Sequence, residues 1–386
     1  MLTNNICRTL IFSLLLLFRA STLSSQVLPP TLQVHPKAAT DSVRYDADDP
    51  AIWIHPTDST KSVIIGTDKD KVEGGLYVWD LHGNEIQFVK LPRPNNVDVR
   101  YNFNLGSRSV DIAVVNLRFV KEMKVFEINP HDGTLIDITA AEGIKTPEVD
   151  KPYGLCLYQR RTDGAMFVIQ SSGDGKSATR LHQYRLLPDS AGKVKGAYVR
   201  AFGEGTIVDK VEGLVADDEL GYIYASDEEV AIRKYYADPD RGDNNQIAEF
   251  GGSDGVRSDR EGLAIYQCDE KSGYLLVSSQ KGEKLSTGKN AANGKVSAIK
   301  IYRREGDDGE PHKHALLATI ETIGSVKTDG LEVTHRPAMP KFPHGFVVKH
   351  DSPGRHFKIY AWEEIAKNFL NVCSNPTPAT TEGQPE

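Results

Sequence analysis

EGLVADDELGYIYASDEE, residues 212–229, is one of six copies of the unit that decides the fold of this chain. In each copy a short apolar strand begins beside a charged or polar residue, turns, and returns as a second strand that ends in another. In an antiparallel hairpin, the start of the first strand and the end of the second lie at the same edge. The copies therefore predict that their polar ends collect on one face of the molecule. The other five are DDPAIWIHPTDSTKSVIIGTDK from Asp48, NNVDVRYNFNLGSRSVDIAVVNLR from Asn95, YGLCLYQRRTDGAMFVIQSSGDGK from Tyr153, EGLAIYQCDEKSGYLLVSSQ from Glu261 and DGLEVTHRPAMPKFPHGFVVKHD from Asp329.

The spacing of the copies predicts a β-propeller. Their starts are separated by between 46 residues (Pro50 to Asn96) and 68 residues (Glu261 to Asp329), which are propeller-blade lengths. A third β-rich segment follows every hairpin, and a fourth follows several of them. We therefore predict an all-β fold, a six-bladed β-propeller with three to four antiparallel strands per blade. A pair of β-sandwiches would not explain six matching copies, and helical periodicity occurs only in residues 362–370.

The two ends of the chain are expected to lie outside the propeller domain. Residues 1–25 have the pattern of a secretory signal peptide, with a positive charge at Arg8 and a short apolar run over residues 10–18. A buried N-terminal helix is the alternative. We expect the propeller to span residues 31–372, with residues 31–44 adding a strand to the last blade, and residues 375–386 to form a disordered tail. A signal peptide predicts a secreted or periplasmic protein.

Composition limits the partners that this protein can have. The chain has 386 residues, of which 39% are hydrophobic, and this is ample for a sizeable core. The formal net charge is −7 and no dense basic block or stripe occurs, which argues against a nucleic-acid partner. Beyond the signal peptide no apolar run is long enough to cross a membrane. Cys156, Cys268 and Cys373 are too few for a disulfide-built scaffold and match no zinc motif, so we place no cysteine in the chemistry.

The polar ends of the hairpins form a set that suits calcium and an anion. Carboxylate and amide oxygens are hard ligands, which calcium prefers and zinc does not. Crowded carboxylates repel one another and raise each other's pKa values unless a cation is bound among them. Basic side chains interleaved with these acids can neutralise an anion such as a phosphate group. The acids and the amide are Asp48, Asp49, Asp68, Asp98, Glu212, Asp227, Glu228, Asp259, Glu261, Gln280, Asp329 and Asp351, and the bases are Lys69, Arg100, Arg118 and Lys176.

For any single acid in this set, a structural role in a turn is an equal alternative. Asp, Asn and Gly dominate strand-to-strand turns because their side chains bond to nearby backbone groups. The functional interpretation rests on the whole set falling at one edge. The scattered histidines make no metal-binding spacing, and no nucleophile elbow, phosphate-binding P-loop or dinucleotide-binding motif occurs.

At the level of motifs, the chain resembles the β-propeller phytases, a family of calcium-dependent phosphatases that act on inositol hexakisphosphate (phytate). DADDPAIW at residues 46–53 is followed by GTDK at 66–69 and by NNVDVRY at 95–101. Later come EGLVADD at 212–218, ASDEE at 225–229, DREGL at 259–263 and SSQ at 278–280. These motifs occur in the family's order over roughly residues 40–370.

The resemblance implies specific roles for residues of the shared face. It implies direct attack by calcium-bound water on a phosphate monoester, of the 3-phytase type, without a covalent phosphoenzyme. Calcium ions, both catalytic and structural, would be held by Asp48, Asp49, Glu212, Glu228, Asp259, Glu261, Gln280 and Asp329. Among these, Asp49, Glu212, Asp259 and Glu261 would be catalytic. Substrate phosphates would bind to Lys69, Arg118, Tyr153 and Lys176.

Some positions depart from the family pattern. The stretch Ser-Asn-Arg reads Asn116-Leu117-Arg118 here, and the choice between Lys176 and Arg180 is open because the preceding loop is longer. We expect a monomeric enzyme whose substrate is phytate, as its calcium complex, with no nucleic-acid or membrane partner. The alternatives are a phosphatase for another small phosphoester and a non-catalytic propeller that binds phosphorylated ligands.

Overall fold

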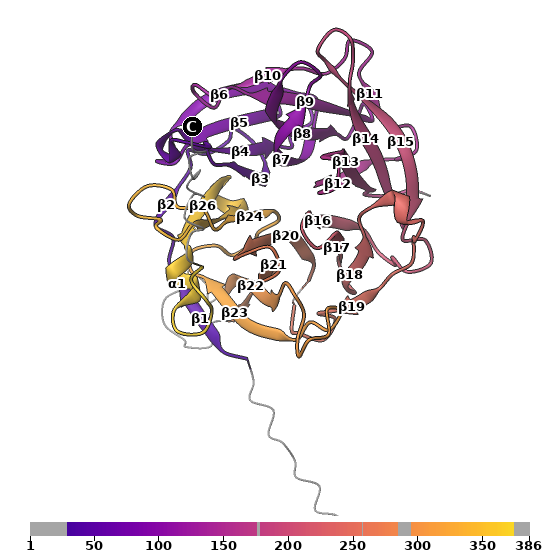
Figure 1. Cartoon of the computed structure of the whole chain (residues 1–386). Coiled ribbons are helices and arrows are strands. Elements are labelled where there is room, and N and C mark those ends of the chain that lie inside the picture. The colour runs from indigo at the N-terminus through magenta and orange to yellow at the C-terminus, as the bar shows by residue number, and fades with distance from the viewer. Residues whose placement is uncertain (1–28, 176–177, 257, 285–294, 374–386) are drawn as a thin grey trace, which may run out of the picture.

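The computed structural model describes residues 29–175, 178–256, 258–284 and 295–373. Its strands form six small sheets arranged in a ring, and each sheet is one blade of a β-propeller (Figure 1). The predicted all-β, six-bladed fold is therefore confirmed. In every blade the first two strands of the repeat pair with each other as the antiparallel hairpin that the sequence predicts. The predicted signal peptide and the predicted tail lie outside the described residues.

The first three blades follow one another directly along the chain. Blade one contains β3 (Ala47–Trp53), β4 (Val63–Asp68), β5 (Gly75–Asp80) and β6 (Glu85–Lys90). Blade two contains β7 (Pro94–Asn104), β8 (Ser109–Leu117), β9 (Glu122–Ile128), β10 (Leu135–Asp137) and β11 (Ile144–Lys145). Blade three contains β12 (Pro152–Gln159), β13 (Met166–Ser172), β14 (Leu181–Pro188) and β15 (Val194–Phe202).

The last three blades include strands from both ends of the described chain. Blade four contains β16 (Val211–Asp217), β17 (Tyr222–Asp227), β18 (Ala231–Tyr236) and β19 (Ala248–Phe250). Blade five contains β20 (Arg260–Gln267), β21 (Gly273–Lys284), β22 (Lys295–Arg303), β23 (Leu316–Thr322) and β1 (Thr31–Val34). Blade six contains β24 (Leu331–Thr334), β25 (Phe346–Asp351), β26 (His356–Ala361) and β2 (Ala38–Ala39). The short helix α1 (Trp362–Ala366) follows it.

Closure of the ring differs in one respect from the sequence-based expectation. The segment 31–44 was expected to add its strand to the last blade, and β2 does pair there, antiparallel to β26. The longer strand β1, however, pairs in parallel with β23 at the outer edge of blade five. The N-terminal segment therefore spans two blades and ties the fifth to the sixth.

The apolar core lies between neighbouring blades. Val114 of β8 and Val168 of β13 belong to one buried cluster, which joins blades two and three. Ile64 of β4 and Val348 of β25 belong to another, which joins blade one to blade six. Because each strand alternates its side chains, every blade can bury residues against both neighbours. The packing holds the six inner strands in fixed relation to one another.

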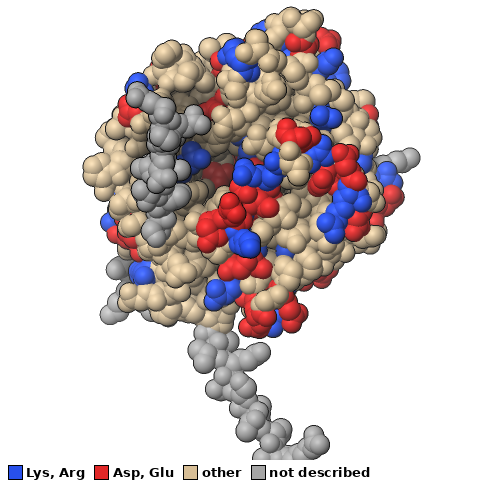
Figure 2. Space-filling model, viewed as in Figure 1, with Lys and Arg blue, Asp and Glu red and all other residues tan. Residues whose placement is uncertain are grey.

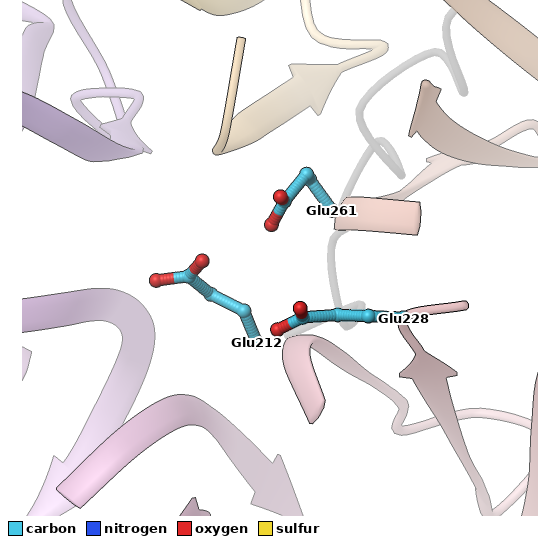
Figure 3. A group of neighbouring side chains, drawn as sticks. All are labelled: Glu212, Glu228 and Glu261. Carbon is cyan, nitrogen blue, oxygen red and sulfur yellow. The ribbon is translucent and has the colours of Figure 1, made fainter. Parts of the chain in front are cut away.

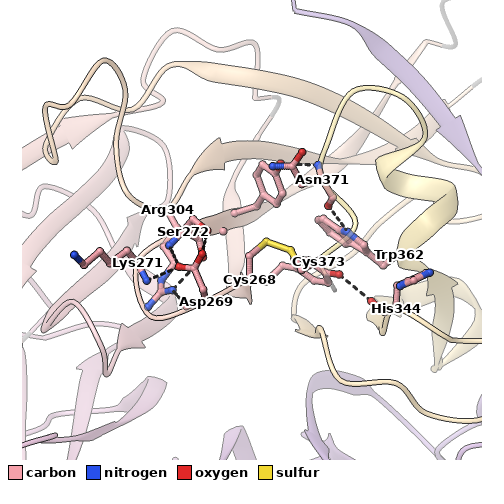
Figure 4. The surroundings of a disulfide bond; sticks show 12 residues. Cys268, Asp269, Lys271, Ser272, Arg304, His344, Trp362, Asn371 and Cys373 are labelled. Atoms are coloured by element: carbon pink, nitrogen blue, oxygen red, sulfur yellow. Dashed lines mark hydrogen bonds between the residues drawn. A yellow bond between two sulfur atoms is a disulfide. The ribbon is translucent and has the colours of Figure 1, made fainter. Parts of the chain in front are cut away.

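A disulfide bond between Cys268 and Cys373 fastens the C-terminal segment to blade five (Figure 4). Cys268 follows β20, and Cys373 follows α1, whose Trp362 stacks on Tyr266 with ring centroids 3.6 Å apart. The sequence did not predict this bond, since three cysteines allow several pairings. Cys156, in contrast, is buried and free.

The viewed face of the molecule carries basic and acidic side chains that alternate, without a continuous basic stripe (Figure 2). Among the described residues, no helix is both long and apolar enough to cross a membrane.

Candidate active site

The inner strands of five blades begin with the same backbone irregularity. The register of each first hairpin shifts near its start, between Ala47 and Pro50, Pro94 and Val97, Pro152 and Leu155, Val211 and Leu214, and Arg260 and Leu263. Such β-bulges bend the strand and re-aim side chains. The polar residues that open the hairpins lie within these bulges, which explains why they recur at matching places in the sequence.

A glycine follows the site residue in blades four and five because the neighbouring inner strand approaches closely. A Cβ atom at Gly213 would collide with the carbonyl oxygen of Glu261, and one at Gly262 would lie 2.5 Å from the amide nitrogen of Leu331. The Glu-Gly pairs therefore combine a side chain at the site with a backbone that lets adjacent blades meet.

Three glutamates from two blades point toward one another (Figure 3). Glu212 is the second residue of β16, Glu228 follows β17 and Glu261 is the second residue of β20. They offer carboxylate oxygens that lie within 4.8 Å of one another, and all three residues are buried. Burial, followed by the nearby charge of Glu212, raises the pKa of Glu228 to about 7 and that of Glu261 well above its ordinary value. A cation among these carboxylates would relieve both effects.

The donor atoms around this cluster fit a hard cation. Oε1 of Glu228, Oε2 of Glu261 and Oδ2 of Asp48 are buried, and none accepts a hydrogen bond from the described residues. Unsatisfied buried carboxylate oxygens are costly, so a ligand is expected to bind to them. Carboxylate oxygens without nitrogen or sulfur donors match the preference of calcium.

A second group of predicted residues surrounds Lys69, between blades one and six. The Lys69 Nζ donates to Oδ1 of Asp48 at 2.6 Å and to Oδ2 of Asp329 at 3.3 Å. Burial lowers the pKa of Lys69, but Asp48 and Asp329 outweigh it and the net shift is upward. Although burial acts in the opposite sense, Lys69 lowers the pKa of Asp329 to about 2. Lys69 therefore lies between two of the predicted metal ligands.

Gln280 links the two groups. Its Nε2 donates to Oε1 of Glu261 at 2.6 Å and to Oδ1 of Asp329 at 3.3 Å. The carbonyl of Asp259 accepts from the Gln280 backbone amide at 3.1 Å. The Asp259 carboxylate is close enough to Lys210 to contribute to raising the pKa of that amine.

Asp49 is buried between blades one and two. Its Oδ2 accepts from the amide of Val97 at 3.0 Å, and its own amide donates to Oγ1 of Thr67 at 3.0 Å. Burial raises its pKa well above the ordinary value. None of the hydrogen bonds that Asp49 makes within the described part of the chain involves the three glutamates, so Asp49 lies near the ring but outside their cluster.

On the side of blades two and three, Arg118 and Tyr153 lie together. The guanidinium carbon of Arg118 is 4.7 Å from the centre of the Tyr153 ring, and Oη of Tyr153 donates to Oε2 of Glu212 at 2.8 Å. Tyr153 therefore connects Arg118, a predicted phosphate-binding residue, to Glu212, a predicted metal ligand. Lys176, the other predicted phosphate-binding residue, lies outside the described residues.

Two residues of the site were missed by the sequence analysis. Asn95 donates to Oε1 of Glu212 at 2.9 Å and accepts from Arg118 at 3.0 Å. Lys210 donates to Oε2 of Glu228 at 3.0 Å. Lys210 precedes the start of the fourth hairpin by two residues, and this position indicates that it lies near the shared polar face.

Other members of the sequence-predicted ring have structural contacts. Asp68 accepts from the backbone amides of Tyr45 and Asp46 at 3.0 Å each, and Asp227 accepts from the side chain of Arg233 at 2.7 Å. The contacts of these two acids are those of the structural alternative, in which an acid at a hairpin end stabilises the fold and does not bind a ligand.

Below the ring, a cavity of about 350 Å³ follows the inner strands away from the site. Arg100, proposed from sequence as an anion-binding residue, is engaged there with Asp98 at 3.0 Å and Asp218 at 2.8 Å. Glu332 also lines this cavity, and burial, followed by the charge of Asp98, raises its pKa to about 8. The positive charge of Arg100 is therefore balanced by Asp98 and Asp218 inside this cavity.

Comparison with known proteins gives one family. The family model described as Phytase matches residues 4–375. The 3-phytase of Bacillus subtilis strain 168 is 32% identical over 333 residues, which cover 84% of this chain and 81% of that protein. Among solved structures, a protein from Lactobacillus plantarum covers 82% of this chain and 80% of its own at 14% identity, with a TM-score of 0.49, a likeness too low to add to the argument.

Proposed function

This chain belongs to the phytase family, and from that premise we propose that it hydrolyses phosphate monoesters of phytate in a calcium-dependent reaction at the ring of acids described above. The observation that carries this proposal is the cluster of Glu212, Glu228 and Glu261, whose buried carboxylates require a cation. Arg118 lies on the adjacent side of the same ring, where it can bind a phosphate group.

The residues that would hold calcium lie around the buried carboxylate oxygens of Asp48, Glu228 and Glu261 that accept no hydrogen bond from the described residues. They are Glu212, Glu228 and Glu261, with Gln280 and Asp259 beside them, and Asp48 and Asp329 around Lys69. When bound, calcium would neutralise phosphate oxygens and lower the pKa of a coordinated water, so that a nucleophile exists near neutral pH. The chain itself supplies the ligands, the orientation of the substrate and a largely buried setting.

Phytate suits this arrangement on charge grounds. It carries several phosphate groups, so one can lie over the metal-binding acids while its neighbours meet Arg118 and Lys210 at the rim. Lys69 and Lys176 are proposed to serve the same purpose. Tyr153 is neutral, because burial and the Glu212 charge raise the pKa of its phenol, and it can therefore donate a hydrogen bond at the edge of the site.

We also propose that the protein works in a secreted or periplasmic compartment. The signal-peptide pattern motivates this proposal, and the Cys268–Cys373 disulfide supports it because such bonds persist in oxidising environments. Fractionation of cells expressing the full chain, followed by detection of the protein, tests it. Recovery of all of the protein from the cytoplasm with its signal segment intact would contradict it.

The deciding experiment measures phosphate release from phytate by the purified protein at a series of free calcium concentrations. We expect activity with calcium and its loss in excess chelator, with recovery when calcium is restored. Undiminished release in excess chelator would exclude the calcium-dependent reaction. Phosphate release from other phosphomonoesters but not from phytate would favour a phosphatase that acts on another small phosphoester. Binding of phytate without phosphate release would favour a non-catalytic binding module.

A further inference from the structure

Asn95 occupies the bulge at the start of β7 and has no exposed surface. Its Nδ2 donates to Oε1 of Glu212 at 2.9 Å and to Oδ1 of Asn96 at 2.7 Å. Its Oδ1 accepts from a terminal nitrogen of Arg118 at 3.0 Å. The orientation of the amide is fixed by these partners, since a guanidinium only donates and a carboxylate only accepts. One side chain therefore joins a cation on blade two to an acid on blade four.

A second connection runs parallel to the first. The ring of Tyr153 lies under the Arg118 guanidinium, and its hydroxyl donates to the other oxygen of Glu212 at 2.8 Å. Gly173 leaves room for this arrangement, because a Cβ atom there would lie 2.7 Å from a terminal nitrogen of Arg118. Both oxygens of Glu212 thus have a donor, and each donor also contacts the same arginine.

We propose that Asn95 is a positioning residue that couples the phosphate-binding guanidinium of Arg118 to the metal-binding carboxylate of Glu212. This inference rests on the proposed function, since it assigns Arg118 to phosphate and Glu212 to the cation. In this role Asn95 acts through Arg118 and Glu212, whose side-chain orientations it fixes.

The chemistry of an amide is required for this role. Leucine has the same branching and number of side-chain heavy atoms but no polar atom, so it would remove this hydrogen-bond partner from both Arg118 and Glu212. Aspartate can still accept from Arg118 but cannot donate to Glu212 at neutral pH. Hydrogen-bond partners of metal ligands typically change metal affinity or activity by about 10–100-fold when they are removed. Loss of Asn95 should therefore affect calcium binding and phosphate binding together.

The test uses two equilibrium readouts and one cycle of variants. Calcium binding is measured by calorimetry, and phosphate binding by the inhibition constant of inorganic phosphate in phytate hydrolysis. For Asn95→Leu we expect calcium affinity to fall about tenfold and the phosphate inhibition constant to rise about tenfold. In an Arg118→Ala background, Asn95→Leu should not change the phosphate constant further, because its partner is already absent.

Asn116 provides the matched control. It is also fully buried, but among the described residues its side chain bonds only to backbone atoms, accepting from the amide of Asn96 at 3.0 Å and donating to the carbonyl of Tyr153 at 2.8 Å. Asn116→Ala should lower the melting temperature. When Arg118→Ala is added to this variant, it should weaken phosphate binding as much as it does in the wild type. A purely structural Asn95 would behave as Asn116 does.

The outcomes separate this inference from the proposed function. Failure of the wild-type protein to bind calcium or hydrolyse phytate would reject the proposed function. Wild-type activity, with Asn95→Leu lowering only the melting temperature or acting additively with Arg118→Ala, would overturn the coupling. If Asn95→Leu does not fold, Asn95→Ser and Asn95→Asp are used to test the coupling. Asn95→Ser should weaken the binding of both calcium and phosphate, whereas Asn95→Asp should retain phosphate binding within about twofold. Unchanged calcium and phosphate binding in Asn95→Ser would also overturn it.

Discussion

Tyr153 donates a hydrogen bond from its phenolic oxygen to Oε2 of Glu212 at 2.8 Å, across the boundary between blades three and four. Burial, followed by the Glu212 charge, raises the pKa of the phenol, so the proton stays on Tyr153 over the whole physiological range. The same ring lies under Arg118. Tyr153 therefore has two separable contributions, a hydroxyl for the acid and a ring for the base.

The first prediction separates these contributions. Tyr153→Phe removes the hydroxyl and keeps the ring, so we expect kcat for phytate to fall about tenfold while KM changes little. Tyr153→Leu removes both, so KM should rise in addition. Steady-state kinetics at saturating calcium measure the difference. Equal effects of the two variants on KM would show that the ring does not support Arg118.

The second prediction concerns a buried ion pair between blades four and five. Arg304 donates to both oxygens of Asp217, at 2.6 and 2.7 Å, and both side chains are 1% exposed. Arg304→Met would leave a buried carboxylate without its counter-charge, which costs about 3–5 kcal/mol of unfolding free energy. Denaturant titration in the presence of calcium measures it.

A double variant and a surface control complete this second test. Replacing Asp217 by Leu together with Arg304→Met should recover a large part of the loss, because no unpaired charge then remains. The exposed pair of Lys313 and Asp308 serves as control, and Lys313→Met should leave stability unchanged. If Arg304→Met and Lys313→Met lowered the unfolding free energy equally, burial would not be the reason why the loss of Arg304 is costly.

The third prediction concerns the Cys268–Cys373 disulfide, which spans 105 residues. Replacing both cysteines by serine should lower the unfolding free energy by about 2–4 kcal/mol, because the unfolded chain regains the freedom that the bond removes. Cys268 follows the end of β20 opposite to Glu261, so kcat and KM below the melting temperature should not change. Thermal unfolding of the wild type with and without reductant is the control, and reductant should reproduce the effect.

Much of this site could be predicted from the sequence because its residues repeat. Glu212 and Glu261 each precede a glycine at the start of an apolar strand, and that pattern follows from the bulge and the close approach of adjacent blades. The repeats placed Glu228 at the same edge because the end of the second strand of an antiparallel hairpin lies beside the start of the first. Whether Asp68 caps backbone amides or binds a ligand depends on where those amides point, and periodicity carries no such information.

Features that join distant segments could not be predicted. The role of Asn95 depends on Glu212, which is 117 residues away, and an Asn-Asn pair by itself is typical of a turn. The parallel pairing of β1 with β23 depends on which outer edge is open after the ring has closed. The pairing of Cys268 with Cys373 likewise depends on where the segment that follows α1 lies relative to blade five.

The fourth prediction concerns pH and Glu332, which lines the channel below the site. Burial, followed by Asp98, raises its pKa from 4.5 to about 8. Between these values the folded protein holds a proton that the unfolded chain has released, so the unfolding free energy falls as pH rises through this window. The contribution is fully lost above pH 8, and Glu332→Gln, which cannot ionise, should remove this part of the pH dependence and leave the part that comes from Glu228 and Glu261.

We therefore expect Glu332→Gln to match the wild type at pH 4.5 and to exceed its stability by about 4–5 kcal/mol at pH 9, because each unit of pKa shift corresponds to about 1.4 kcal/mol. Urea titrations at several pH values, in chelator so that calcium does not contribute, give the comparison. Glu142→Gln, at an exposed position, should leave the pH profile unchanged. A wild-type profile that Glu332→Gln leaves unaltered would mean that Arg100 holds Glu332 ionised throughout, because that guanidinium is the nearby charge that opposes protonation.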